Sequence, residues 1–210
     1  MKLFFKKVNK LKQGYTIIET MIAVSLFLII IMSGMGALLN ANLLHQKSQS
    51  MRSIIDNLSF IMEDLSRNLR TGYTYRCITA NPDLTPPNVD DPKSGSSCWG
   101  IAFESANGSA SDNNDQWVYY VGPDTSLPGS PLAIWRSISG PYNNTSNFVK
   151  LTPDEVVIDP VSSFSVLGAE PLPDTQQPFV IIKLVGTITF KNVITPFSLQ
   201  TSVSQRVLDI

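Results

Sequence analysis

Residues 15–39, YTIIETMIAVSLFLIIIMSGMGALL, decide how this chain is organised. The stretch has a single charged side chain, Glu19, and its last 19 residues are almost entirely apolar. A helix rises about 1.5 Å per residue, so 25 residues extend about 37 Å, enough to cross a hydrocarbon core of about 30 Å. We therefore expect a membrane-spanning helix here rather than a buried core helix.

The charge of the chain is unevenly distributed around this segment. The 210 residues include 16 basic and 17 acidic side chains, for a net charge of −1. Residues 1–14 hold five Lys and no acid, which leaves 11 basic residues against 17 acids in the rest. Lysine-rich flanks stay in the cytoplasm, so we expect everything after residue 39 to lie outside the inner membrane. An acidic remainder also argues against nucleic-acid binding by this chain.

Two ordinary membrane signals remain alternatives for this segment. A cleaved secretory signal normally has 7–15 apolar residues and ends in a site like A-x-A, and the nearest small residues here are Gly34 and Gly36. An uncleaved signal anchor needs only the basic flank and the apolar run. Neither alternative explains Glu19, because a carboxylate inside a spanning helix costs about 2.5–3.5 kcal/mol.

A cleavage after Gly14 would give Glu19 a partner. The new amine of Tyr15 would lie at the membrane edge, four residues before the carboxylate. Glu19 would then neutralise an ammonium in its own chain or in a neighbouring copy, and its charge suits a helix N-terminus.

The run from Lys12 to Ile22, KQGYTIIETMI, resembles the class III signal of type IV prepilins and type II secretion pseudopilins. The resemblance implies cleavage between Gly14 and Tyr15 by prepilin peptidase, N-methylation of Tyr15, and roles in assembly for Thr16 and Glu19. Tyr15 replaces the commoner Phe, and Thr20 replaces the usual aliphatic residue. A chance match before an ordinary anchor is the alternative.

The resemblance also implies a function and a set of partners. We expect a structural subunit, not an enzyme, of a type IV pilus or a type II secretion pseudopilus, either a minor pilin or a J-type minor pseudopilin. Its partners would be prepilin peptidase, other pilin or pseudopilin subunits, the inner-membrane assembly platform and, before assembly, membrane lipid. The rival hypothesis is a single-pass anchored protein whose outer β domain binds a ligand.

The resemblance implies an α+β organisation, the pilin fold. A leader at residues 1–14 precedes a membrane or filament-core helix at 15–39, an amphipathic helix at 40–72 and a β-rich head at 73–210. Apolar residues recur at spacings of three and four between Leu44 and Leu69, and no Pro interrupts residues 15–72. Gly72 is the expected C-cap.

Residues beyond the helix read as short strands separated by turns. We expect strands at residues 100–104, 116–121, 132–138, 156–158, 163–167, 179–185, 187–191 and 197–204. Residues 185–187, Val-Gly-Thr, mark either a bulge or a bend within one longer strand.

Few residues of the head carry chemistry. Cys77 and Cys98 flank a polar loop, and in an oxidising space they would form a disulfide worth about 3 kcal/mol; two separate buried thiols are the alternative. The acidic run at 112–115, DNND, is interpreted as a polar turn, although its oxygens suit calcium. We expect no metal and no cofactor.

Overall fold

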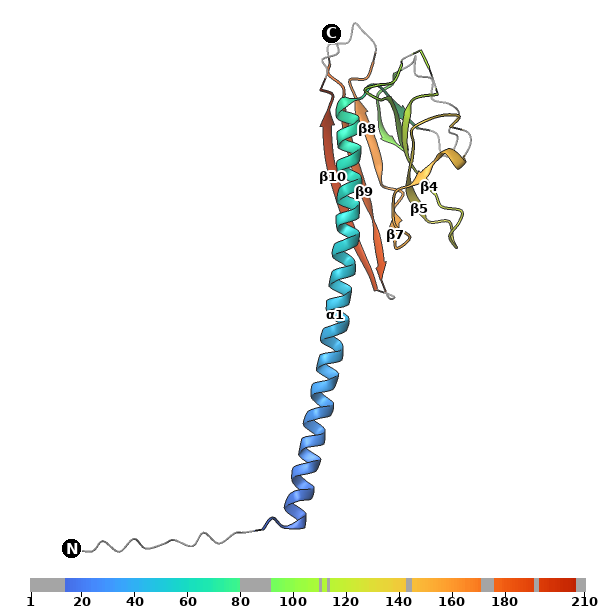
Figure 1. Ribbon diagram of the computed structural model, residues 1–210. Helices are drawn as coiled ribbons and strands as arrows, with labels where there is room; N and C mark the ends of the chain where they lie inside the picture. The colour runs from blue at the N-terminus through green and yellow to red at the C-terminus, as the bar shows by residue number, and fades with distance from the viewer. Residues whose placement is uncertain are drawn as a thin grey trace, which may run out of the picture. The chain divides into compact units, whose positions relative to one another are not determined.

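The computed structural model describes residues 14–79, 92–109, 111–112, 114–142, 145–170, 176–190 and 193–206. The leader residues 1–13 lie outside this set. The chain divides into two compact units, residues 1–48 and 49–210. One helix, α1 (Ile17–Thr71), contributes to both units, and ten strands follow it in the second (Figure 1). This is the α+β layout expected from the sequence, a long apolar N-terminal helix followed by an antiparallel sheet.

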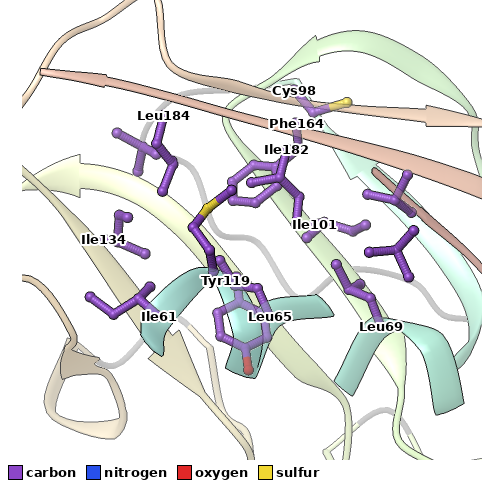
Figure 2. Packing of buried hydrophobic residues seen from close by; sticks show 14 of the residues in the cluster. Ile61, Leu65, Leu69, Cys98, Ile101, Tyr119, Ile134, Phe164, Ile182 and Leu184 are labelled. Carbon is purple, nitrogen blue, oxygen red and sulfur yellow. The ribbon is translucent and has the colours of Figure 1, made fainter. Parts of the chain in front are cut away.

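The second half of α1 is amphipathic and packs on the sheet. Its buried side chains recur at helical spacing and face one side only: they are Ile54, Leu58, Ile61, Met62, Leu65 and Leu69. Figure 2 shows Ile61, Leu65 and Leu69 meeting strand residues such as Ile101, Ile134 and Phe164. These contacts hold the C-terminal part of α1 on the head.

The strands form one antiparallel sheet with the order β1-β3-β4-β5-β7-β9-β8-β2. Their bounds are β1 (Tyr73–Ile78), β2 (Gly95–Cys98), β3 (Gly100–Glu104), β4 (Trp117–Pro123), β5 (Leu132–Ser137), β6 (Val149–Lys150), β7 (Val156–Ile158), β8 (Ser163–Leu167), β9 (Phe179–Phe190) and β10 (Val193–Ser204). β6 pairs with β5, and β10 pairs with β9.

Strand β9 is a single strand of 12 residues, where the sequence suggested two strands or one bent strand. Its pairing with β10 runs from Phe179 to Phe190 without a shift in register, so Gly186 is not a bulge. A Cβ at Gly186 would lie 2.3 Å from the carbonyl oxygen of Val157 in β7. The glycine therefore permits a close approach between neighbouring strands.

Strand β10 begins four residues earlier than expected and includes Pro196. Proline removes a backbone donor, which is tolerated on a strand that has a neighbour on only one side. β10 pairs only with β9 among the described strands, and Pro196 lies opposite Thr187. The hydrophobic pattern predicted the strand from residue 197 onward. Residues 193–196 were not predicted, because proline at 196 disfavours a strand.

Gly72 follows the helix as predicted, but it is not a left-handed cap. It is absent from the positive-φ residues, and its N–H donates to the carbonyl of Asn68 at 3.0 Å, which continues the helical pattern by one bond. A Cβ there would lie 2.4 Å from the ring of Phe103. Packing against β3, rather than backbone conformation, requires glycine at this position.

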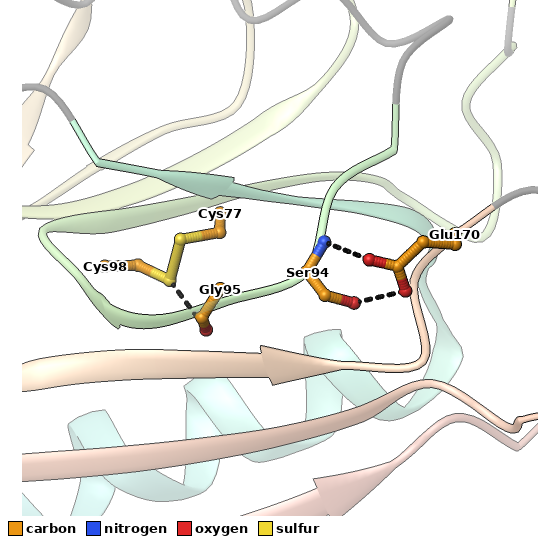
Figure 3. The surroundings of a disulfide bond; sticks show 5 residues. All are labelled: Cys77, Ser94, Gly95, Cys98 and Glu170. Carbon is orange, nitrogen blue, oxygen red and sulfur yellow. Dashed lines mark hydrogen bonds between the residues drawn. A yellow bond between two sulfur atoms is a disulfide. The ribbon is translucent and has the colours of Figure 1, made fainter.

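The disulfide between Cys77 and Cys98 joins the two ends of the sheet (Figure 3). Cys77 lies in β1 and Cys98 in β2, which are the first and last strands of the sheet order. The sheet therefore curls until its end strands meet, and the bond fixes that closure. Gly95 is needed beside it, because a Cβ there would lie 2.4 Å from the sulfur of Cys77.

Candidate functional site

The first turn of α1 holds the residues that the sequence singled out. Gly14, Tyr15 and Thr16 precede the helix, and Glu19 is the acidic residue of its first turn. The hydroxyl oxygen of Thr16 accepts a hydrogen bond from the N–H of Glu19 at 3.3 Å. Thr16 is thus the N-cap, and a carboxylate three residues later favours the positive end of the helix dipole. The sequence pattern T-x-x-E at residues 16–19 is typical of such a cap.

The Glu19 side chain itself has no partner within the described part of the chain. Other polar side chains nearby are satisfied by their own helix: the hydroxyls of Thr20, Ser25 and Ser33 donate to carbonyls three or four residues earlier. No described basic side chain lies between Glu19 and His45. Glu19 is an exposed carboxylate that can form an ion pair with a cationic group from elsewhere.

The apolar part of α1 is not covered by any other described part of the chain. Every residue from 14 to 46 is exposed, and its large apolar side chains range from 39% exposed at Ile31 to 81% at Tyr15. α1 is the one described helix long and apolar enough to cross a membrane. A surface of this kind needs lipid or other helices around it, so the first unit is compatible with a single-pass membrane anchor.

Gly14, Gly34 and Gly36 share one property. A Cβ built at any of these three positions meets nothing within 4 Å. The helix runs without interruption through Gly34 and Gly36, so they do not break it. A larger side chain at these glycines meets no steric conflict within the described part of the chain. Any effect of such a substitution would therefore report on contacts with other molecules.

The head is joined to the C-terminal part of α1 by a polar cluster. Asp64 accepts hydrogen bonds from Arg136 at 3.0 Å and from the hydroxyl of Tyr119 at 3.1 Å, and Asn68 donates to the same carboxylate group. Burial is the main reason why the pKa of Tyr119 rises to about 12. The cluster fixes the rotation of the helix on the sheet.

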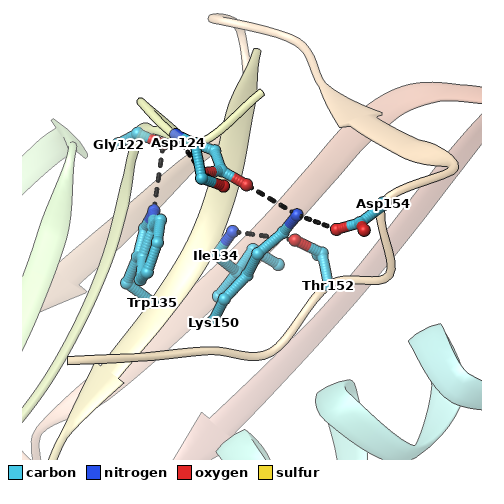
Figure 4. A network of polar contacts seen from close by, with 8 residues as sticks. Gly122, Asp124, Ile134, Trp135, Lys150, Thr152 and Asp154 are labelled. Carbon is cyan, nitrogen blue, oxygen red and sulfur yellow. Dashed lines mark hydrogen bonds and ion pairs between the residues drawn. The ribbon is translucent and has the colours of Figure 1, made fainter. Parts of the chain in front are cut away.

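A second polar cluster ties strand β6 to the loop that follows β4 and to the loop that follows β6 itself (Figure 4). The ammonium of Lys150 lies 2.7 Å from Asp124, which is almost fully buried, and also pairs with Asp154. Hydrogen bonds from Lys150 and then from Ser126 lower the pKa of Asp124 to about 2. Asp124 and Lys150 form a charged pair at neutral pH, and the cluster has a structural role.

A third group, around Glu104, was missed by the sequence analysis. Glu104 ends β3 and is completely buried, and within the part of the chain that the structure describes neither carboxylate oxygen accepts a hydrogen bond. Burial and then Asp115 raise its pKa to about 7. Its position in the sequence could have indicated this burial. Glu104 comes two residues after Ala102 in an expected strand, and side chains two residues apart lie on the same face of a strand.

The loop at 105–116 next to Glu104 contains the acidic run interpreted as a polar turn. Asp112 accepts a hydrogen bond from the N–H of Asn114, and Asp115 accepts one from the N–H of Ser109 at 2.8 Å. These are turn interactions, as expected. Among the described residues no three His, Cys, Asp or Glu side chains converge as a metal-binding group.

Open hollows also occur beside the end of α1. The larger has a volume of about 400 Å³ and is lined by Glu63, Ser66, Arg67, Arg70, Thr71 and Arg206. Arg67 already pairs with Glu63 at 3.3 Å. The hollow is a shallow, mixed-charge surface.

No protein-family model, curated protein or solved structure matches the chain.

Proposed function

We propose that the chain is a structural subunit of a helical filament, a type IV pilus or a type II secretion pseudopilus. Prepilin peptidase would cut it after Gly14 and methylate the amine of Tyr15. The inner-membrane assembly platform would then move it from the membrane into the filament. The head stays outside the cytoplasm throughout, and the chain performs no catalysis.

The observation that carries this proposal is the exposed apolar half of α1 with a single acid in its first turn. Burying apolar surface is worth about 25 cal/mol per Å², so the segment is stable only when covered. Lipid covers it before assembly, and apolar helices of neighbouring subunits cover it afterwards. Exchange between two apolar surroundings has a small net cost, which suits a subunit that must leave the membrane.

Glu19 supplies the specificity that apolar packing lacks. Its carboxylate has no partner in the described chain, and the proposed cut creates an ammonium at Tyr15. Pairing between Glu19 of one copy and Tyr15 of the next would set the register of neighbouring helices. Thr16 keeps the first turn helical, so that the carboxylate is held at a fixed position.

The head supports a minor rather than a major subunit. The head is a ten-stranded sheet joined by loops, and a head of this size is what the family resemblance leads us to expect of a minor subunit. A minor pilin or a J-type minor pseudopilin fits this size, and the acidic balance outside the leader gives no reason to assign it nucleic acid.

Cleavage is tested by Gly14→Val in the native host, with Gly34→Val as the matched control. Both positions have open space for a side chain, so neither change disturbs the fold. We expect Gly14→Val to accumulate at the mass of the full precursor and Gly34→Val to be processed normally. Normal processing of Gly14→Val would contradict the proposed cleavage and favour an uncleaved anchor.

Register is tested by Glu19→Gln and Thr16→Ala. The amide keeps the size and hydrogen-bonding capacity of Glu19 but removes its charge. We expect Glu19→Gln to be cleaved yet depleted about tenfold or more from sheared filaments, whereas Thr16→Ala, which loses only the cap, is incorporated with a smaller reduction. Full incorporation of Glu19→Gln would rule out the charge pairing.

A further inference from the structure

The carboxylate of Glu104 is buried on the face of the sheet that α1 does not cover. Ile101 and Phe103 of β3 belong to the main core beneath the helix, whereas Ala102 belongs to a smaller cluster with Val118 and Tyr142. Glu104 is in phase with Ala102 and therefore faces this second cluster. Its side chain is 0% exposed, and no donor among the described residues reaches either oxygen.

Two other residues with unsatisfied buried oxygen atoms are neighbours of Glu104 in the chain fold. Asp115 comes within hydrogen-bonding reach of it, and the second oxygen of Asp115 is also buried without a partner. The register of β3 and β4 pairs Phe103 with Trp117, so Gln116 continues opposite Glu104. The amide oxygen of Gln116, a residue 1% exposed, has no partner either.

Two tyrosine hydroxyls near Glu104 already donate to backbone carbonyls. The hydroxyl of Tyr142 donates to the carbonyl of Gln116 at 2.8 Å, and the hydroxyl of Tyr73 donates to the carbonyl of Gly108 at 2.8 Å. Gly108 lies against Glu104 so closely that a Cβ there would be 2.4 Å from the carboxylate. The charged groups that act on Glu104 are Asp115 and Asp112, both acidic.

Two carboxylates and an amide oxygen that lie close together, with no basic partner among the described residues, need either a shared proton or a cation between them. We propose that Glu104, Asp115 and Gln116 hold a divalent cation, with Ca²⁺ as the preferred ion. The cation would tie the loop at 105–116 to the end of β3. This assignment does not depend on the filament function.

The chemistry of the donors selects calcium. All are hard oxygen atoms, and no Cys or His is among them. Ca²⁺ accepts carboxylate, amide and backbone carbonyl oxygens in irregular geometry and fills the remaining positions with water, whereas Mg²⁺ demands a near-ideal octahedron. Sites in proteins outside the cell typically bind Ca²⁺ with Kd values of about 0.1–1 mM. Only two carboxylates are present, so we expect an affinity in that range.

The test uses the full chain in detergent, stripped with EDTA and dialysed at pH 7.5. We expect 5 mM CaCl₂ to raise the Tm of the head by about 5 °C, and 5 mM MgCl₂ to raise it by less than half as much. Glu104→Gln and Asp115→Asn should each abolish the calcium response. Glu155→Gln, which removes an exposed carboxylate elsewhere in the head, should keep it.

Two results would overturn the proposal. An unchanged Tm in 5 mM CaCl₂ would mean that the Glu104 and Asp115 carboxyl groups share a proton instead of a metal ion. A calcium response that persists in both Glu104→Gln and Asp115→Asn would place the cation elsewhere. If Glu104→Gln does not fold, Asp115→Asn alone decides, because Asp115 is only partly buried and its loss is easier to tolerate.

Discussion

The two compact units differ in what surrounds their apolar side chains, although α1 contributes to both. From residue 14 to 46 every side chain is exposed, and in the second unit Leu58, Leu65 and Leu69 are completely buried. The second unit is stabilised by its own core, and the first depends on surroundings that the chain does not supply. The stability of the head and the proposed role in assembly thus depend on different parts of the same helix, and substitutions can separate them.

The largest difference is expected from one leucine in each unit. Leu65→Ala removes a fully buried side chain and should lower the free energy of unfolding of the head by about 4 kcal/mol. Leu28→Ala, at a side chain 50% exposed, should change it by less than about 0.5 kcal/mol. Urea unfolding in detergent, followed by the tryptophan fluorescence of the head, measures both. Equal losses would mean that the two units unfold together.

The disulfide gives the next largest effect, confined to the second unit. Its two cysteines are 21 residues apart, so the loop-entropy estimate gives about 3 kcal/mol. The double variant Cys77→Ala, Cys98→Ala should lose that amount and no longer respond to dithiothreitol. Wild-type protein in the reductant should lose the same amount. A double variant as stable as the wild type would show that the closure of the sheet needs no crosslink.

Glycine-to-alanine changes sharpen the comparison further. Gly72→Ala places a methyl group against Phe103 and the carbonyl of Glu104, and should cost about 2 kcal/mol. Gly36→Ala meets open space and should raise helix stability by up to about 1 kcal/mol. Thermal unfolding followed by circular dichroism separates the two. A loss of stability in Gly36→Ala would show that α1 bends there in solution.

The smallest effect is expected at acid pH, in the Asp124–Lys150 pair of the head. The pKa of Asp124 falls from 3.8 to about 2 in the folded chain, mainly through Lys150. The pair therefore contributes stability above pH 4 and loses it as the pH falls from about 4 to about 2. Asp124→Asn should be less stable than the wild type at pH 7, and its stability should change less between pH 4 and pH 2. The midpoints of urea unfolding measure both. Parallel curves for the two proteins would exclude this contribution.

The sequence predicted local features better than long-range ones. The apolar helix and most strands were predicted because the spacing of apolar residues within a short segment indicates each of them. The disulfide was predicted because the chain has only two cysteines and they flank one loop. β1, β2 and the two-residue β6 were missed. β2 has the sequence GSSC, and only its disulfide to β1 and its pairing with β8 make it a strand. Glu104 was missed because its burial depends on the loop at 105–116 folding over it. The roles of Gly14, Tyr15, Thr16 and Glu19 in processing and assembly remain predictions.

The mass of the chain purified from its native membrane tests the central claim most directly. We predict an intact mass that begins at Tyr15 and carries one added methyl group, with a fragment spectrum that places the methyl on the amine of Tyr15. A chain that begins at Met1, or at any residue other than Tyr15, would contradict the account, because Glu19 would then have no ammonium to pair with at the start of the helix.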